Sequence, residues 1–346
     1  MAAINICTTL WACGLRVPLP RSFQSNTMKI CILDGYTLNP GDLSWHNLER
    51  LAMCQIFDRT GQDQILERCA DAEIILTNKV GLTSSMLEKL PKLEFISVMA
   101  TGYNVIDVSR AKELNITVSN AAGYSSQSVA QHTFALILEH FSMAGAHNQH
   151  VTQNDGWRKQ PDFSYSLKTR HDIGGKKIGL IGYGAIGSQV AKIAQAFGME
   201  VLINRRNTKG ELPEGMRYAS LEEMAAQCDI ISLHCPFTGD NKHMVNEGFL
   251  NSMKKSSVLI NTSRGQLVDE KALATALNEG QIAGAGLDVL SQEPPGGDSP
   301  LIGATNCIIT PHNAWSTLEA RQRLMTIMVE NVRSFLIGDP INVVNL

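Results

Sequence analysis

The sequence has no apolar run of about 18 residues, the length that a transmembrane helix needs, so no membrane-spanning segment is predicted. It also lacks an excess of charge of one sign, because 30 Lys and Arg stand against 33 Asp and Glu. This balance excludes the broad basic surface of a nucleic-acid-binding protein and electrostatic attachment to an anionic membrane. Of the 346 residues 44% are hydrophobic, which is enough for about two globular domains with their own cores.

Cysteine pairs with C-x-x-C spacing are absent among the eight cysteines, which excludes a zinc knuckle and a thioredoxin-like redox motif. Several cysteines lie in apolar, strand-like runs, as Cys31 does. We therefore expect reduced thiols in a protein core and a cytoplasmic location. No metal site is expected, because the clustered His140, His147 and His150 lack a carboxylate or cysteine at ligand spacing.

The N-terminal segment differs in composition from the rest of the chain. Residues 1–27 contain two arginines and no carboxylate, and the first acidic residue is Asp34. This composition resembles a weak organelle transit peptide. The alternative is an upstream start codon, because Met28 leads directly into a predicted buried strand. We assign residues 1–27 to an N-terminal extension outside the folded core.

Short apolar runs alternate with helical patterns along the rest of the chain. The first series of predicted strands comprises residues 29–33, 74–77, 95–99 and 116–119, with helices at 43–53 and 84–90. The second series comprises residues 177–181, 201–204, 230–234, 258–262, 286–289 and 307–310. Continuous apolar strands separated by helices indicate parallel sheets covered on both faces. The sequence thus predicts an α/β fold with two doubly wound parallel sheets, connected by a long helix over residues 126–147.

A glycine-rich loop gives the first chemical signal. Gly182, Gly184 and Gly187 stand between a predicted buried strand and an amphipathic helix. The first glycine permits a tight turn, the second lets the backbone approach a pyrophosphate, and the third lets helix and strand pack closely. Since a helix N-terminus attracts anions, dinucleotide phosphates are expected against this loop, including Ala185 and Ile186.

The end of the next strand indicates which dinucleotide binds. NAD-selective sites usually carry Asp or Glu there, which accepts hydrogen bonds from the ribose 2′-OH. This chain has Asn204, Arg205 and Arg206 instead. A carboxylate would repel a 2′-phosphate, whereas arginines would pair with it, so NADP(H) is the expected cofactor. The alternative is a permissive site with two solvated arginines, which would also bind NAD(H).

Three candidate catalytic residues each follow a predicted strand: Arg264, Glu293 and His312. Alone, each has an ordinary structural interpretation, namely a surface ion pair, a turn carboxylate and a buried imidazole. Together they lie at the carboxyl ends of strands, where open α/β sheets bind ligands. This shared position favours a common catalytic role.

These motifs together resemble the D-isomer-specific 2-hydroxyacid dehydrogenases over residues 28–346. The resemblance rests on the glycine loop, Met253–Asp269, the Gln292-Glu293-Pro294 turn and Thr310-Pro311-His312. It implies a Rossmann cofactor domain inserted into a smaller flavodoxin-like substrate domain, with the active site in the cleft. The implied cofactor domain comprises residues 126–313, and the substrate domain residues 28–125 and 314–346.

The resemblance also implies roles for individual residues. Arg264, Glu293 and His312 would be the catalytic residues, and Arg264 would also contact the substrate. Backbone N–H groups of the substrate-binding loop, Ala100, Thr101, Gly102 and Tyr103, would hold the substrate carboxylate. Further cofactor contacts are expected from Cys235, Pro236, Thr262, Ser263, Asp288 and Ala314. Asn204 departs from the aspartate common in the family, which puts NAD specificity in doubt but not the activity.

The chemistry of 2-oxo acid reduction suits the three candidates. The reaction needs a hydride at the carbonyl carbon and a proton at the carbonyl oxygen. His312 could supply the proton and Glu293 could orient the imidazole, while Arg264 could polarise the carbonyl. The hydride would come from the nicotinamide cofactor.

The resemblance narrows the expected substrates and assembly. Residues 312–315 and 319–324 are similar to the glycerate dehydrogenase/hydroxypyruvate reductase group, so hydroxypyruvate and glyoxylate are expected to give D-glycerate and glycolate. A homodimer is expected, because the family is usually dimeric and the apolar helix at 126–147 is long enough to contribute. The alternative function is a dinucleotide-sensing interaction module of the corepressor type. Retention of all three catalytic residues and the short C-terminus weigh against it.

Overall fold

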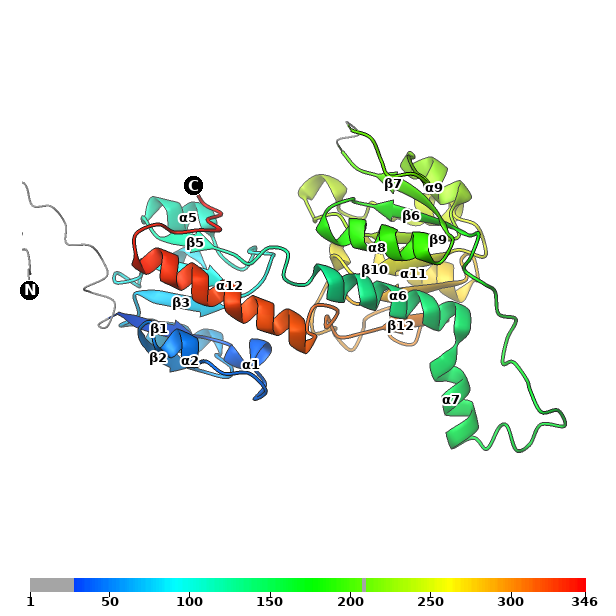
Figure 1. Ribbon diagram of the computed structural model, residues 1–346, viewed down its shortest axis with the longest axis horizontal. Helices are drawn as coiled ribbons and strands as arrows, with labels where there is room; N and C mark the ends of the chain where they lie inside the picture. The colour runs from blue at the N-terminus through cyan, green and yellow to red at the C-terminus, as the bar shows by residue number, and fades with distance from the viewer. Residues whose placement is uncertain (1–27, 207–209) are drawn as a thin grey trace, which may run out of the picture. The chain divides into compact units, whose positions relative to one another are not determined.

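The computed structural model describes residues 28–206 and 210–346, so the predicted N-terminal extension lies outside the described residues. The chain divides into two compact units (Figure 1). The first unit ends at Tyr124 and resumes over Arg321–Leu346, and the second unit, Ser125–Ala320, is inserted between these segments. The return to the first unit, at Arg321, falls seven residues beyond the predicted position at 314, since Thr317 still hydrogen-bonds Ser128 of the second unit at 2.9 Å.

The first unit is built on a parallel sheet of five strands in the order β2-β1-β3-β4-β5. The strands are β1 (Lys29–Ile32), β2 (Met53–Ile56), β3 (Ile74–Thr77), β4 (Phe95–Val98) and β5 (Thr117–Ser119). The helices are α1 (Gly35–Leu38), α2 (His46–Glu49), η3 (Gln62–Gln64), α3 (Ile65–Cys69), α4 (Ser84–Leu87), α5 (Val108–Glu113) and most of α12 (Leu318–Leu336). The strand order reverses at β1, so the switch point of this sheet lies between β1 and β3.

One element of the first unit was predicted wrongly. The helix expected over residues 43–53 is the short α2, and residues 53–56 form the edge strand β2. An edge strand has one neighbour, and Met53 is 57% exposed, so β2 has no continuous buried run that would have predicted it.

Helix α12 brings the C-terminal segment back onto the first sheet. Phe335 stacks on Phe95 of β4 with ring centroids 4.5 Å apart. Arg321, at the start of the returning segment, forms a two-pronged ion pair with Asp42, with both N–O distances at 2.6 Å. The C-terminal segment, Arg321–Leu346, therefore completes the core of the first unit rather than forming a domain of its own.

The second unit contains a parallel sheet of seven strands in the order β12-β11-β10-β9-β6-β7-β8. The strands are β6 (Lys177–Ile181), β7 (Glu200–Asn204), β8 (Met216–Tyr218), β9 (Ile230–Leu233), β10 (Val258–Asn261), β11 (Gly284–Leu287) and β12 (Cys307–Ile309). The helices are α6 (Ser126–Ser142), α7 (Ala144–Gln153), α8 (Ala185–Ala196), α9 (Leu221–Gln227), η4 (Gly239–Asn241), α10 (Glu247–Ser252), η5 (Gly265–Leu267) and α11 (Glu270–Asn278). The two parallel sheets with flanking helices confirm the predicted α/β fold class. The switch point lies between β6 and β9, where the chain changes direction across the sheet.

The long helix predicted over residues 126–147 is divided in two. Met143 adopts a left-handed conformation with φ of 55°, which ends α6 and begins α7. The apolar side of α6 packs into the core of its own unit through Ala130, Phe134 and Ile137. These side chains are thus covered within one copy of the chain, so they do not form the dimer surface that the sequence suggested.

Within the described part of the chain, no helix is long and apolar enough to cross a membrane. The six described cysteines are free thiols: Cys31, Cys54, Cys69, Cys228, Cys235 and Cys307.

Candidate active site

The glycine loop of the second unit has the geometry of a phosphate cradle. Gly182 follows β6 with φ of +105°, and a Cβ there would lie 2.5 Å from the carbonyl carbon of His234. A Cβ on Gly187 would lie 2.3 Å from the carbonyl oxygen of Gly182. Gly184 precedes the 12-residue helix α8, and a Cβ there would meet nothing within 4 Å. Two glycines are therefore required by close packing, while the third borders open space at a helix N-terminus, where Ala185 and Ile186 begin α8. This arrangement fits the pyrophosphate of a dinucleotide.

The end of β7 carries the residues expected to choose the dinucleotide. The amide of Asn204 donates to the carbonyl oxygen of Ala219 at 2.9 Å, so it holds the strand end in place. The guanidinium of Arg205 lies 5.5 Å from the ring centre of Tyr218, and Arg206 donates to the Thr238 hydroxyl at 3.1 Å. Two cations and no carboxylate thus stand at the end of this strand.

The segment after β9 lies beside the glycine loop. Burial lowers the pKa of His234 to about 4, so its imidazole is neutral at physiological pH. Cys235 follows it, and burial raises the pKa of this thiol, which therefore stays protonated. The hydroxyl of Ser263 donates to the carbonyl oxygen of Cys235 at 2.5 Å, which joins the ends of β9 and β10. Pro236 is exposed at this edge.

Arg264 lies in a turn after β10 that is held by backbone contacts. The amide of Asn261 donates to the Arg264 carbonyl oxygen at 2.9 Å, and its oxygen accepts from the Ser263 N–H at 3.0 Å. A Cβ on Gly265 would lie 1.9 Å from the carbonyl carbon of Leu290, so the two loops are in direct contact. Arg264 and the loop that leads to Glu293 are therefore neighbours. This role of Asn261 was not predicted from the sequence, although an amide side chain at the end of a buried strand could have indicated it.

Glu293 and His312 form the predicted carboxylate–imidazole pair. Oε2 of Glu293 lies 2.6 Å from Nδ1 of His312, and the two side chains are 35% and 24% exposed. The other carboxylate oxygen, Oε1, accepts from the backbone N–H of Leu290 at 3.1 Å. The carboxylate is thus fixed at both oxygens, and Nε2 of His312 is left for other contacts.

A buried carboxylate holds the loop that carries His312. Asp288, 2% exposed, accepts from the Thr310 hydroxyl at 2.6 Å and from the backbone N–H groups of Asn313 and Ala314, both at 3.0 Å. Its own carbonyl oxygen accepts from the His312 N–H at 2.8 Å. His132 of α6 contacts the Thr310 hydroxyl at 2.9 Å. This set of loop contacts was not predicted, because it joins residues that are far apart in the sequence.

Two of the residues expected to contact the cofactor are largely buried in the second unit. Thr262 is 8% exposed, and its hydroxyl lies 3.1 Å from that of Thr133 on α6. Ala314 is 3% exposed. Both therefore contribute to the packing of this edge. The carboxyl edge of the second sheet brings together the glycine loop, the β7 end, Cys235, Ser263, Arg264, Asp288, Glu293 and His312.

Residues 100–103 belong to the first unit and follow β4. Three of their four carbonyl oxygens are anchored. That of Ala100 accepts from the N–H of Ala121 at 3.0 Å, and that of Thr101 accepts from the side-chain amide of Asn120 at 2.7 Å. The Tyr103 carbonyl accepts from the N–H of Ile106 at 3.0 Å. None of the four N–H groups has an acceptor in the part of the chain that the structure describes. A loop with anchored acceptors and open donors suits an anion.

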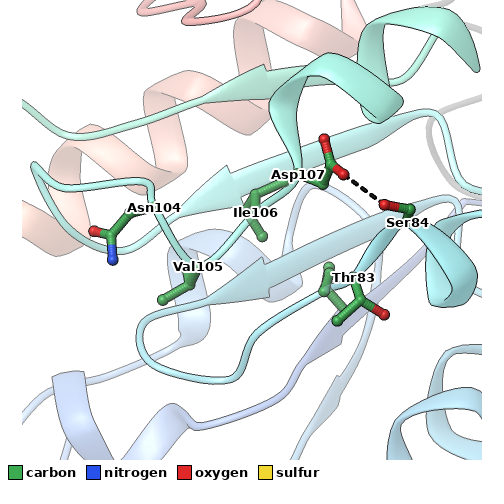
Figure 2. A pocket seen from close by; sticks show the side chains of 7 residues that line it. Thr83, Ser84, Asn104, Val105, Ile106 and Asp107 are labelled. Atoms are coloured by element: carbon green, nitrogen blue, oxygen red, sulfur yellow. Dashed lines mark hydrogen bonds between the residues drawn. The ribbon is translucent and has the colours of Figure 1, made fainter. Parts of the chain in front are cut away.

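The first unit also has a surface pocket of about 330 Å³ (Figure 2). It is lined by Leu82, Thr83, Ser84, Asn104, Val105, Ile106 and Asp107. Asp107 is its only acidic side chain, and Figure 2 shows it bonded to the Ser84 hydroxyl, at 2.5 Å. The same carboxylate caps α5 by accepting from the N–H of Arg110 at 2.9 Å. The pocket contains none of the predicted site residues, and its carboxylate serves the local structure.

Within residues 28–206 and 210–346, no group of three or more His, Cys, Asp or Glu side chains could hold a metal ion. The clustered histidines have local roles, since His147 contacts the Met143 carbonyl oxygen at 2.7 Å and His150 contacts the Tyr165 hydroxyl at 2.8 Å. His140 is half-buried, and burial lowers its pKa.

Comparison with known proteins shows the family to which the chain belongs. Residues 134–314 match the family model described as D-isomer specific 2-hydroxyacid dehydrogenase, NAD binding domain. The chain is 46% identical to a hydroxypyruvate reductase of Blautia hydrogenotrophica over 92% of this chain and 100% of that protein. It is 42% identical to a glycerate dehydrogenase of Methylorubrum extorquens, over 82% of this chain and 88% of the relative.

Solved structures agree with the sequence relatives. An acyclic imino acid reductase in complex with NADPH and D-arginine superposes with a TM-score of 0.79 at 35% identity, over 92% of this chain and 100% of that one. A D-lactate dehydrogenase from Aquifex aeolicus, complexed with NAD and lactic acid, gives a TM-score of 0.78 at 31% identity, over 90% and 96% of the two chains. The glycine loop, the parallel sheets and these matches lead to one conclusion: the chain belongs to the D-isomer specific 2-hydroxyacid dehydrogenase family and is an oxidoreductase that binds a nicotinamide dinucleotide.

Proposed function

We propose that this enzyme reduces small 2-oxo acids to D-2-hydroxy acids, with hydroxypyruvate and glyoxylate as the preferred substrates. The observation that carries the proposal is the 2.6 Å contact between Glu293 and Nδ1 of His312 at the carboxyl edge of the cofactor-binding sheet. The names of the relatives, hydroxypyruvate reductase, glycerate dehydrogenase and glyoxylate reductase, support this substrate class. Nothing in these comparisons supports the corepressor alternative.

The proposed mechanism assigns one task to each side chain. His312 donates a proton from Nε2 to the carbonyl oxygen of the substrate, because Nδ1 is held by Glu293. Glu293 holds Nδ1 and so fixes the orientation of the imidazole ring. Arg264 donates to the substrate's carbonyl and carboxylate oxygens, which polarises the reacting bond. The bound nicotinamide supplies the hydride.

The first unit contributes the proposed carboxylate-binding loop. The open N–H groups of Ala100, Thr101, Gly102 and Tyr103 would donate to the substrate carboxylate. An ionised acceptor strengthens such hydrogen bonds to roughly twice the strength of neutral ones. The anchored carbonyls keep the donors in place before the substrate binds, which lowers the entropy lost on binding.

The test of the function is a steady-state assay of small 2-oxo acids with NADPH and with NADH. We expect hydroxypyruvate or glyoxylate to give the highest kcat/KM, and the D-enantiomer of the product where it is chiral. If the enzyme binds the dinucleotide but reduces none of these acids, the proposal is contradicted and a sensing role is favoured.

We further propose that NADPH is preferred over NADH, through contacts of Arg205 and Arg206 with the 2′-phosphate. A hydrogen bond to a charged group contributes about 1.5–3 kcal/mol, so one such contact should raise kcat/KM for NADPH by about tenfold or more. High salt should reduce the ratio, because exposed charges are screened. The Arg205→Ala/Arg206→Ala enzyme should lose the NADPH advantage and keep its NADH activity. Better use of NADH than NADPH by the wild type would show that the arginines have no such role.

We also propose that the enzyme is a homodimer in the cytoplasm. The free thiols suit that compartment. The segment after α7 carries two large exposed aromatic side chains, Trp157 at 53% and Phe163 at 89%, which suit contact with a second copy. Light scattering should give twice the mass of the chain, and the Trp157→Ser/Phe163→Ser variant should shift it toward the monomer at micromolar concentration. A monomeric wild type would contradict this.

A further inference from the structure

The switch point of the first unit's sheet carries two buried polar side chains. Asp34 follows β1 and Asn78 follows β3, the two strands between which the strand order reverses. They are only 4% and 3% exposed. Buried polar groups need a reason, and the carboxyl edge at a switch point is where ligands of such sheets bind.

Asp34 fixes the backbone of the segment that carries Asn78. Its Oδ1 accepts from the Asn78 N–H at 2.8 Å, and its Oδ2 accepts from the N–H groups of Lys79 at 2.6 Å and Val80 at 3.3 Å. Burial raises the pKa of this carboxyl group, and the three N–H bonds act in the opposite direction. The three bonds together place Asn78 at the end of β3.

Asn78 in turn orients the first peptide of the carboxylate-binding loop. Its amide nitrogen donates to the carbonyl oxygen of Met99. The Met99–Ala100 peptide is trans, because the one cis peptide of the described residues is Glu293–Pro294. In a planar trans peptide the C=O and N–H bonds point in opposite directions. The N–H of Ala100 therefore points away from Asn78, and it is the first of the four open donors of the loop.

The rest of the Asn78 side chain does not help the fold. Its oxygen, Oδ1, is buried and has no hydrogen-bond partner among the described residues. Such an orphaned acceptor destabilises a protein, whereas leucine, of similar size, would leave no side-chain oxygen unpaired. The hydrogen bond to the Met99 carbonyl is thus what asparagine provides at position 78 and leucine would not.

We propose that Asn78 is a positioning residue for the substrate carboxylate, acting through the Met99–Ala100 peptide, and that Asp34 holds it there. The proposal rests on the proposed role of the Ala100–Tyr103 loop. Without the hydrogen bond from the Asn78 side chain, the Met99–Ala100 peptide can rotate. The Ala100 N–H then no longer points in one fixed direction. Binding of the 2-oxo acid should weaken, while binding of the dinucleotide should not.

The Asn78→Leu variant tests this with two readouts. We expect KM for glyoxylate to rise about fivefold or more, together with the Kd of the unreactive analogue oxamate for the NADPH-saturated enzyme. The kcat and the Kd of NADPH should change by less than about twofold, since a misaligned donor chiefly weakens binding of the carboxylate. A smaller rise in KM and Kd, or a loss confined to kcat, would overturn the proposal. If Asn78→Leu does not fold, Asn78→Ser takes its place, with the same expected changes in KM, Kd and kcat.

A matched control separates positioning from stability. Asn345 also bridges backbone groups in the first unit, donating to the Ile116 carbonyl at 2.8 Å and accepting from the Val118 N–H at 2.9 Å. The Asn345→Leu variant should have a lower melting temperature and unchanged oxamate affinity. An equal loss of affinity in this variant would also overturn the proposal, because destabilisation alone would then explain it.

A loop variant separates this inference from the proposed function. Gly102→Pro removes one of the open N–H groups and leaves Asn78 intact. If Gly102→Pro weakens oxamate binding and Asn78→Leu does not, the loop binds the carboxylate and the role of Asn78 is wrong. If neither variant affects oxamate binding, the role of the loop itself fails.

Discussion

Replacement of His312 by glutamine should lower kcat for 2-oxo acid reduction by about 100-fold or more, the lower end of the range for loss of a general acid. Glutamine can still donate a hydrogen bond, but it cannot transfer a proton at neutral pH. Because the proposed role is confined to the proton, the Kd of NADPH should be unchanged. Stopped-flow measurement of NADPH oxidation would give the rate of the chemical step.

His243→Gln is a matched control for this experiment. His243 lies in the same unit and, like His312, has a left-handed backbone, with φ values of 52° at both positions. Both substitutions therefore impose the same conformational demand on glutamine, but His243 is exposed and has no proposed role. Near-normal turnover of His312→Gln at neutral pH would exclude His312 as the proton donor.

The second large effect is expected at Arg264. Arg264→Gln should lower kcat/KM by about 100-fold to 1,000-fold, the range found when one donor to a developing oxyanion is lost. Arg264→Lys should recover part of this loss, since it restores the charge without the planar pair of donors. Arg158→Gln, at a side chain 87% exposed, is the control for loss of one positive charge. An Arg264→Gln enzyme with unchanged kcat/KM would show that this arginine does not contact the substrate.

The residues predicted for the second-unit site lie where sequence reasoning can find them. Each follows a strand of the parallel sheet, and continuous apolar runs such as Val258–Asn261 are strong signals of such strands. Since all carboxyl ends of a parallel sheet lie at one edge, the predicted strands were enough to bring Glu293 and His312 to the same edge. Strand β11 was predicted two residues late, because two of its four residues are glycines.

The contacts that hold these residues could not be predicted in the same way. Asp34 and Asn78 are 44 positions apart, and Asp288 and Thr310 are 22 apart. No periodicity connects such pairs, and their partners are mainly backbone groups, whose direction depends on the folded loop. The edge strands β2 and β8 were missed for a related reason, since each is short and partly exposed.

The contacts of Asp288 have a consequence for the entropy of catalysis. A loop that must find its active conformation after the substrate arrives loses backbone entropy in every cycle, at about 1–2 kcal/mol per residue. Thr310, Asn313 and Ala314 are already bonded to one buried carboxylate, and the His312 N–H is bonded to the carbonyl of the same residue. The ordering of this loop therefore belongs to the folding of the second unit, and turnover begins with the imidazole already in place.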